Sequence, residues 1–194
     1  MIDKIKTRQD LPAILDAHRQ RGLRIVLTNG CFDLLHIGHI RYLQSARALG
    51  DLLIVAVNSD SSVRLLGKGP GRPIVPEAHR AEVLSALSCV DYVVLFDEPS
   101  PLEIITFLKP DILAKGGDWT LDQIVGRDSV ESRKGTVHIL PLVPGFSTTT
   151  LIEKIQTLQV EECSKRGEFT TRETPKGGDG PPHPSNSSST SLQR

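Results

Sequence analysis

Net charge, cysteine and long apolar runs are scarce in this sequence, and each scarcity removes a class of function. Lys and Arg number 23 and Asp and Glu number 23, so no net charge recruits nucleic acid or an anionic membrane surface. The cysteines Cys31, Cys89 and Cys163 form neither a CxxC pair nor a metal-ligand spacing, which argues against a disulfide framework and indicates a reducing compartment. No apolar run approaches membrane-spanning length, and the N-terminal segment lacks the pattern of a secretory signal. We therefore expect a cytoplasmic protein that binds its anions locally, with neither nucleic acid nor a membrane as partner.

Apolar clusters of strand type alternate with segments of helical period along most of the chain. The expected strands are Leu23–Thr28, Leu52–Asn58, Tyr92–Phe96, Asp111–Lys115 and Thr136–Leu140. The expected helices are Ile37–Leu49, Ser61–Leu66, Glu77–Leu87, Pro101–Leu108 and Thr148–Leu158. Strands and helices that take turns in this way form a parallel sheet covered on both faces. The sequence therefore predicts a single-domain, doubly wound, Rossmann-like α/β fold.

The two ends of the chain differ from this central pattern. Residues 1–22 are expected to form an N-terminal helical segment ahead of the main domain, which spans residues 23–158. Residues 164–194 contain the run KGGDGPPHPSNSSST, which cannot bury enough surface to offset the entropy lost on ordering it. We expect a disordered tail there.

The segments that follow strands are the places to look for a site. In an open parallel sheet, the ligand crevice lies beyond the carboxyl ends of the strands, where the strand order reverses. The segments in question are Asn29–His39, Asn58–Asp60, Gly116–Trp119 and Pro141–Thr149.

The most informative of these segments belongs to the run TNGCFDLLHIGH, residues 28–39, which joins the first strand to the first helix. His36 and His39 are three residues apart, so both imidazoles can project from one face of the first helical turn. Gly38 leaves room for a ligand to approach the backbone, and the unpaired amides of a helix start bind phosphate oxygens. We therefore expect a phosphate pocket at this turn. A zinc site is an alternative, but no third residue completes a metal-ligand spacing, so no protein-bound metal is expected.

The segment TNGCFDLLHIGHIRYL resembles the signature of the HxGH nucleotidyltransferase superfamily, which includes cytidylyltransferases and adenylyltransferases of small phosphorylated metabolites. Within it, the chain most resembles the bacterial D-glycero-beta-D-manno-heptose 1-phosphate adenylyltransferases. The resemblance covers residues 23–155 and continues through LIVAVNSD at 53–60, GRPIVP at 71–76, the helix with His79 and Arg80, LKPDILAKGGDW at 108–119, and FSTTTLIEKI at 146–155.

This resemblance implies a reaction and a set of site residues. A phosphate oxygen of the sugar 1-phosphate attacks the α-phosphorus of ATP, so that ADP-heptose forms and pyrophosphate leaves; Mg²⁺ bound to ATP is the implied cofactor. The residues implied in catalysis are His36, His39, Lys68 and Arg80. Those implied in nucleotide binding are Asn29, Gly30, Phe32, Asp33, Gly38, Lys115, Gly117, Asp118, Ser147, Thr148 and Thr149. Asp60 and Arg72 are implied in binding the sugar phosphate.

Two of these segments also have ordinary structural interpretations. Hydroxyls at Ser147–Thr149 are typical N-caps, and Thr150 with Glu153 fits a capping box. Gly116 and Gly117 permit a turn with positive φ, whether or not a ligand lies against it.

Other functions remain open from the sequence. The HxGH core does not separate an adenylyltransferase from a cytidylyltransferase that acts on glycerol 3-phosphate or phosphoethanolamine. The string His-Ile-Gly-His also occurs in class I aminoacyl-tRNA synthetases, but their lysine-rich second signature is absent from the sequence. A hydride-transferring Rossmann enzyme would carry GxGxxG in the first turn, and this chain does not. A nucleotide-sensing module without catalysis is the remaining alternative. The resemblance implies a separate sugar kinase and a homodimer.

Overall fold

A five-stranded parallel sheet forms the centre of the protein, which a computed structural model describes at residues 3–67, 69, 71–117 and 119–167. The strands are β1 (Ile25–Gly30), β2 (Leu52–Asn58), β3 (Tyr92–Phe96), β4 (Ile112–Gly116) and β5 (Thr136–Leu140). Their order in the sheet is β3-β2-β1-β4-β5, and every neighbouring pair is parallel. The predicted doubly wound α/β fold is confirmed.

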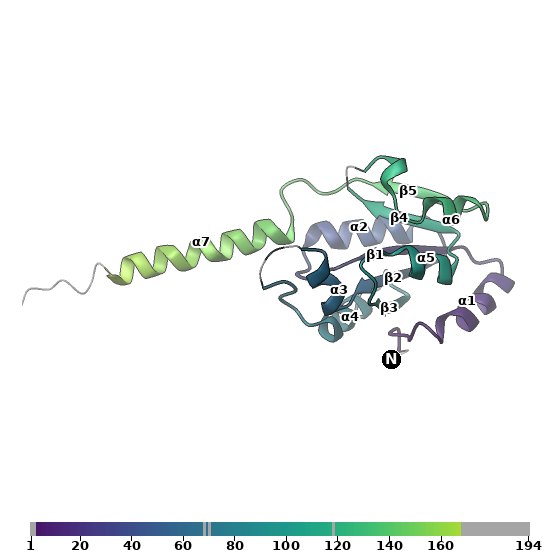
Figure 1. Ribbon diagram of the computed structural model, residues 1–194, viewed down its shortest axis with the longest axis horizontal. Helices are drawn as coiled ribbons and strands as arrows, with labels where there is room; N and C mark the ends of the chain where they lie inside the picture. The colour runs from purple at the N-terminus through teal and green to yellow at the C-terminus, as the bar shows by residue number, and fades with distance from the viewer. Residues whose placement is uncertain (1–2, 68, 70, 118, 168–194) are drawn as a thin grey trace, which may run out of the picture. The chain divides into compact units, whose positions relative to one another are not determined.

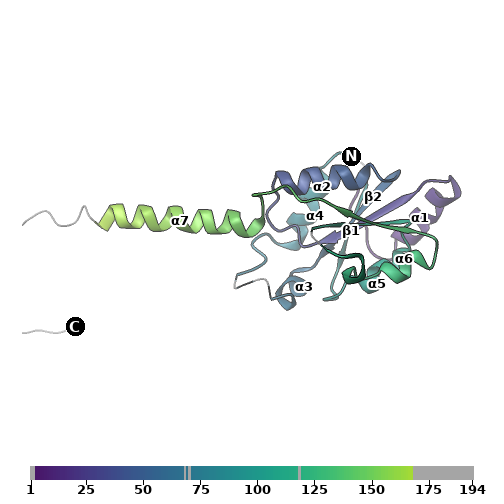
Figure 2. The same cartoon turned by 90° about the horizontal axis from the view of Figure 1, so that it is seen from above.

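Helices cover both faces of this sheet (Figures 1 and 2). The helices of the described chain are α1 (Leu11–Gln20), α2 (Ile37–Arg47), α3 (Asp60–Leu65), α4 (Glu77–Ser85), α5 (Leu102–Leu108), α6 (Arg127–Glu131) and α7 (Thr148–Gly167), and those that pack on the sheet precede α7. Side chains of α1, α5 and α6 pack with one set of strand residues, which includes Ile25, Leu27 and Ile54. Side chains of α2 and α4 pack with the alternate set, which includes Val26 and Val55. The central strands are buried on both faces, as their continuous apolar runs predict.

The N-terminal segment reaches the β3 edge of the sheet before α1 begins. Ile5 forms a parallel bridge with Val93, in which the Lys6 amide donates to the Val93 carbonyl at 2.9 Å. The Val93 amide donates to the Lys4 carbonyl at 2.9 Å, and Lys4 Nζ donates to the carbonyls of Leu87 and Val90. These bonds fasten residues 4–6 along a strand that would otherwise have an open edge.

The structure differs from the sequence-based expectation in a few elements. α6 and a 3₁₀ turn at Leu121–Gln123 were not predicted, and α7 continues to Gly167, into the segment expected to be tail. Residues 168–194 of that segment lie outside the described residues. The chain divides into two units, residues 1–154 and 155–194, and the domain bounds expected from the sequence stay a prediction. Among the described residues, no helix has both the length and the apolar character needed to cross a membrane.

Candidate active site

The strand order reverses between β1 and β4, and a cavity of about 780 Å³ opens at the carboxyl ends of these strands. Lys115, near the end of β4, donates from Nζ to Asn29 Oδ1 on β1 at 2.9 Å. This bond crosses the junction between the two halves of the sheet. Both residues line the cavity, as the rule for open α/β sheets predicts.

His36 and His39 lie together at the start of α2 and line the cavity. Their rings stack, with centroids 3.9 Å apart and planes 27° from parallel. The His36 carbonyl accepts from the amides of His39 (2.9 Å) and Ile40 (3.2 Å), so His36 is the residue from which the helix begins. Burial lowers the pKa of His36 below its ordinary value of 6.5, because a charged imidazolium is poorly solvated there. His36 therefore favours its uncharged form at the cavity wall.

Gly38 provides the space in which the His36 ring lies. A β-carbon at position 38 would come within 2.9 Å of His36 Cε1 and Nδ1, and within 3.7 Å of Phe146 Cβ. The sequence predicts that a ligand can approach the backbone here, and Gly38 does line the cavity, with the His36 imidazole beside it. The absence of a side chain at Gly38 thus allows the His36 ring to lie against the helix start.

Phe32 supports the other histidine from the loop between β1 and α2. Its backbone has φ of 46°, in the left-handed region that a bulky side chain rarely adopts. Its ring packs against His39 with centroids 5.4 Å apart and planes tilted by 59°. Phe32 is therefore a wall behind the histidines as well as part of the cavity lining.

Asp33 holds a second loop in place instead of offering a free carboxylate to the cavity. Its side chain is fully buried and accepts from Arg72 Nε, the Ile74 amide at 2.9 Å and the Val75 amide at 2.8 Å. Burial raises the pKa of Asp33, but the amides of Val75 and Ile74 and the Arg72 guanidinium outweigh it, so the pKa lies below its usual value. Asp33 and Arg72 line the cavity as a mutually neutralised pair.

Arg80 lies outside the cavity lining, although the resemblance implied a catalytic role for it. Its side chain is fully buried, with NH1 donating to the Cys31 carbonyl at 2.5 Å and Nε to the Val75 carbonyl at 2.9 Å. NH2 donates to Asp60 Oδ1 at 2.7 Å, so the implied sugar-phosphate residue Asp60 is paired with Arg80 and also lies outside the lining. Acceptors within the protein meet all three nitrogens of this guanidinium.

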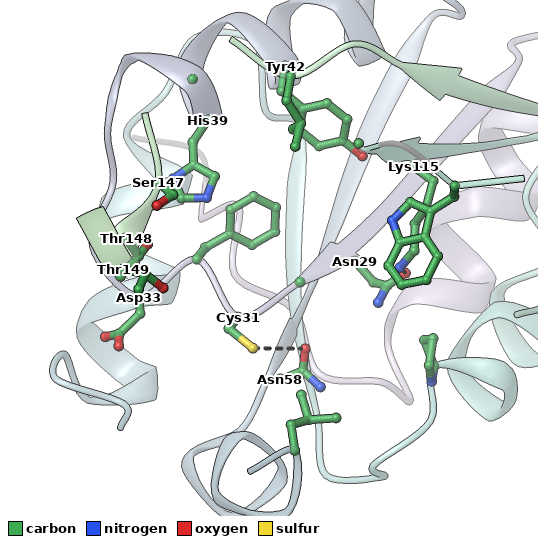
Figure 3. Close-up of a pocket in the computed structure, with 18 of the residues that line it drawn as sticks. Asn29, Cys31, Asp33, His39, Tyr42, Asn58, Lys115, Ser147, Thr148 and Thr149 are labelled. Carbon is green, nitrogen blue, oxygen red and sulfur yellow. Dashed lines mark hydrogen bonds between the residues drawn. The ribbon is translucent and has the colours of Figure 1, made fainter. Parts of the chain in front are cut away.

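Ser147, Thr148 and Thr149 bring the start of α7 to the same cavity. Ser147 Oγ accepts from the Thr150 amide at 3.0 Å, so Ser147, one of the predicted N-cap hydroxyls, caps the helix, and Thr150 is the third residue of the helix instead of its cap. Thr148 Oγ1 donates to the Leu34 carbonyl at 3.3 Å, which ties this helix start to the histidine loop. Figure 3 shows the three hydroxyls at the same end of the cavity as His39, with Lys115 at the other end.

The end of β4 forms the far wall of the cavity. Gly117 is buried with φ of 128°, and a β-carbon there would lie 2.9 Å from Trp119 Nε1. The glycine lets the indole fold back over the strand end, where Trp119 lines the cavity with 49% of its surface exposed. Gly117 itself is not among the lining residues. Lys68 and Asp118 lie outside the described residues.

Several lining residues were missed by the sequence-based reasoning. Tyr42 lies one turn after His39 on α2; its hydroxyl pairs with Thr28 Oγ1 at 2.5 Å and donates to the Ala114 carbonyl at 3.0 Å. Burial raises the pKa of Tyr42 to about 12, so it acts as a neutral spacer between β1 and β4. The i, i+3 spacing from His39 could have identified it. Cys31 and Asn58 lie on the floor, where Cys31 Sγ donates to Asn58 Oδ1 at 3.8 Å (Figure 3). That contact joins residues 27 positions apart, and no local pattern predicts it.

Within the described part of the chain, no group of three or more His, Cys, Asp or Glu side chains is arranged to hold a metal ion.

Comparisons with known proteins agree with this geometry. Residues 27–154 match the family described as cytidylyltransferase-like. The protein named bifunctional protein HldE of Syntrophotalea carbinolica is 57% identical over 152 residues, which are 78% of this chain and 31% of that protein. Its namesake in Geotalea uraniireducens is 55% identical over 159 residues, 82% of this chain and 32% of that protein. The chain thus spans about a third of the length of these relatives.

Two solved structures share the fold. A lipopolysaccharide core biosynthesis protein from Thermoplasma volcanium has 35% identity and a TM-score of 0.53, covering 63% of this chain and 98% of that one. A pantoate-beta-alanine ligase from Francisella tularensis has 15% identity and a TM-score of 0.51, covering 71% of this chain and 66% of that one, and supports the fold alone. With the HxGH histidines at the sheet's reversal point and a family match over most of its length, this chain belongs to the cytidylyltransferase-like family of nucleotidyltransferases.

Proposed function

We propose that this chain transfers AMP from ATP to a sugar 1-phosphate, D-glycero-beta-D-manno-heptose 1-phosphate, to give ADP-heptose and pyrophosphate. The observation that carries the proposal is the stacked pair His36 and His39 at a helix start, facing a cavity that a second helix start also lines. The resemblance to heptose 1-phosphate adenylyltransferases and the relatives named HldE support the choice of sugar.

For this reaction the protein must mainly align the two substrates and stabilise the negative charge of their phosphates. An oxygen of the sugar phosphate forms a bond to the α-phosphorus as the bond to the pyrophosphate oxygen breaks, and that oxygen is already anionic at neutral pH. No general base is needed to create the nucleophile. What the site must offset is the repulsion between two polyanions, by donors held in place before the reaction.

Two helix starts supply such donors. Amides at the N-terminal end of a helix bind phosphate oxygens, and the helix dipole favours negative charge there. α2 presents the imidazoles of His36 and His39, and α7 presents the hydroxyls around Thr149. Lys115 adds a cation at the other end of the cavity, where Asn29 orients it.

Magnesium fits this site as part of the nucleotide and not as a metal held by protein carboxylates. The carboxylate of Asp33 is occupied by Arg72 and two backbone amides, so it has little capacity to bind a cation. Mg²⁺ would therefore arrive on the phosphates of ATP and neutralise part of their charge.

CTP is the second candidate nucleotide, because the family match carries the description cytidylyltransferase-like. A pyrophosphate-release assay decides between them when ATP and CTP are each crossed with heptose 1-phosphate, glycerol 3-phosphate and phosphoethanolamine. We expect turnover with ATP and the heptose. Turnover only with CTP and one of the smaller phosphates would replace the proposal by the cytidylyltransferase alternative.

His39→Ala tests whether the histidine pair carries the reaction. Loss of one preorganised donor typically lowers turnover by about a hundredfold, and the fold should remain intact because the imidazole lines the cavity and not the core. A folded variant with turnover near that of the wild type would contradict the proposed role of the pair.

We extend the proposal to the surroundings of the enzyme. A separate kinase would supply the sugar 1-phosphate, and the chain would work as a homodimer, which light scattering tests directly. The proposed compartment is the cytoplasm, since it holds ATP and suits the free thiols of Cys31 and Cys89.

A further inference from the structure

Phe32 holds a backbone conformation that its own side chain disfavours. A bulky residue at φ of 46° persists only where its surroundings fix it. This conformation packs the Phe32 ring against His39, with the two ring centroids 5.4 Å apart. The question is which contacts hold the turn.

A closed circuit of hydrogen bonds surrounds Phe32. Arg80 NH1 donates to the Cys31 carbonyl on one side of Phe32, and Arg80 Nε donates to the Val75 carbonyl at 2.9 Å. The Val75 amide donates to Asp33 Oδ1, on the other side of Phe32, at 2.8 Å. Both neighbours of Phe32 are thus fastened to one segment, and the Arg80 guanidinium completes the circuit.

Because Arg80 is buried, its main structural role is to complete this hydrogen-bond circuit. The side chain is fully buried, and its charge is balanced by Asp60 Oδ1 at 2.7 Å, outside the circuit. A lysine at this position could pair with Asp60, but its single ammonium cannot reproduce the planar fork that spans two carbonyls and a carboxylate.

We propose that Arg80 is a positioning residue, which holds the Cys31–Asp33 turn so that Phe32 keeps His39 in the orientation needed for nucleotidyl transfer. Arg80 acts through Phe32 and does not touch the substrate. The kinetic part of this inference rests on the proposed function, and the structural part does not.

The first experiment compares Arg80→Met and Arg80→Lys with a matched control, Arg19→Met. Arg19 also bonds to two carbonyls, those of Leu108 and Lys109, and to one carboxylate, Asp16, yet it does not line the cavity. We expect both Arg80 variants to lose about a hundredfold in kcat, as small misplacements of reacting groups do, with a much smaller change in the KM for ATP. Arg19→Met should keep the kcat of the wild type.

A double-mutant cycle with Phe32→Ala then identifies the route of the effect. If Arg80 acts through the phenyl ring, Arg80→Met should cost less than about threefold in kcat once the ring is gone. The ring protons of His39, followed by NMR, should shift in the Arg80 variants in the direction seen for Phe32→Ala.

Three results would overturn the inference: a folded Arg80→Met variant with near-normal kcat, losses that multiply across the cycle, or His39 resonances that stay in place. If Arg80→Met does not fold, the same three criteria apply to Arg80→Lys, which retains the pairing with Asp60. If the wild type shows no turnover with any substrate pair, the proposed function fails, and the His39 resonances alone decide the positioning role.

Discussion

Because Gly38 has no β-carbon, the His36 imidazole can lie close to the backbone at position 38. Gly38→Ala would place a methyl group within 2.9 Å of that ring, which is the movable end of a side chain and can swing aside. We expect kcat to fall by about tenfold to a hundredfold, while the free energy of unfolding stays level or rises by up to about 1 kcal/mol because alanine favours the helix. Steady-state kinetics and thermal unfolding measure the two effects.

The control for this change is the same substitution in a His36→Ala background. There the added methyl group has no ring to displace, so kcat should respond little to Gly38→Ala. A full loss in that background would mean that the glycine acts on the ligand directly, as the sequence-based interpretation had it.

The lowered pKa of His36 predicts the direction in which stability changes with pH. The folded state disfavours the charged ring, so it binds fewer protons than the unfolded state below the ordinary pKa of 6.5. Stability should therefore fall as the pH drops through and below this value, and His36→Gln should flatten that part of the profile. Urea unfolding of both proteins between about pH 5 and about pH 8 tests it; identical profiles would contradict the assignment to His36.

The residues that sequence reasoning placed well are those whose partners are close in the chain. The contact between His36 and His39 follows from a spacing of three residues on a helix start. The partners of Arg80 and Asp33 within the protein were not foreseen because they are distant in sequence: Cys31 lies 49 positions before Arg80, and Val75 lies 42 positions after Asp33. No local pattern reveals that a charged side chain is already paired inside the fold.

At the scale of elements, the start of α7 carries one hydroxyl that caps the helix and another that faces the cavity. Ser147 caps the helix through the Thr150 amide, whereas Thr149 is exposed and lines the cavity. Ser147→Ala should lower the free energy of unfolding by about 1 kcal/mol, as the loss of an N-cap does. Thr149→Val should leave stability unchanged and weaken ATP binding by about tenfold, the cost of one hydrogen bond to a charged group.

Calorimetric titration with a non-hydrolysable ATP analogue and chemical unfolding separate the two variants. If Thr149→Val bound the analogue with wild-type affinity, the helix start would serve structure alone.

The elements themselves were largely predictable, with exceptions that have a physical cause. Strands such as β2 are buried along their whole length and show as continuous apolar runs. α6 has the sequence RDSVE and buries only Val130, so it contains too little apolar periodicity for a pattern to detect. Its position depends on packing against β4, β5 and α5, which only the assembled fold supplies.

Across the whole molecule, Asp33 joins the first loop to a segment about forty residues later, and acid should loosen that junction. Its pKa is held below the ordinary 3.8, so its contribution to stability is full above that value and is lost as the pH falls through the folded pKa. Asp33→Ala should cost about 3 kcal/mol at neutral pH, because Arg72 is then left buried without its partner. The difference from the wild type should shrink in acid; a constant difference would mean that ionisation of Asp33 does not stabilise the fold.

The order of the strands was beyond the reach of the sequence. Alternating strands and helices predict a parallel sheet, but β1 lies between β2 and β4 only because the crossover after β3 returns to the other side of β1. That return creates the crevice and brings Lys115 to Asn29 from 86 positions away. The chain segments that border the site could be named in advance, while the pairing across it could not.

The bridge between Ile5 and Val93 has a practical consequence for handling the protein. An open β-strand edge is a template on which a second molecule can pair its own backbone, the first step of many aggregation reactions. Residues 4–6 occupy that template on β3. Removing the first few residues for expression would therefore leave the β3 edge unpaired and promote aggregation. An N-terminal purification tag should be joined through a spacer that leaves Asp3–Lys6 intact.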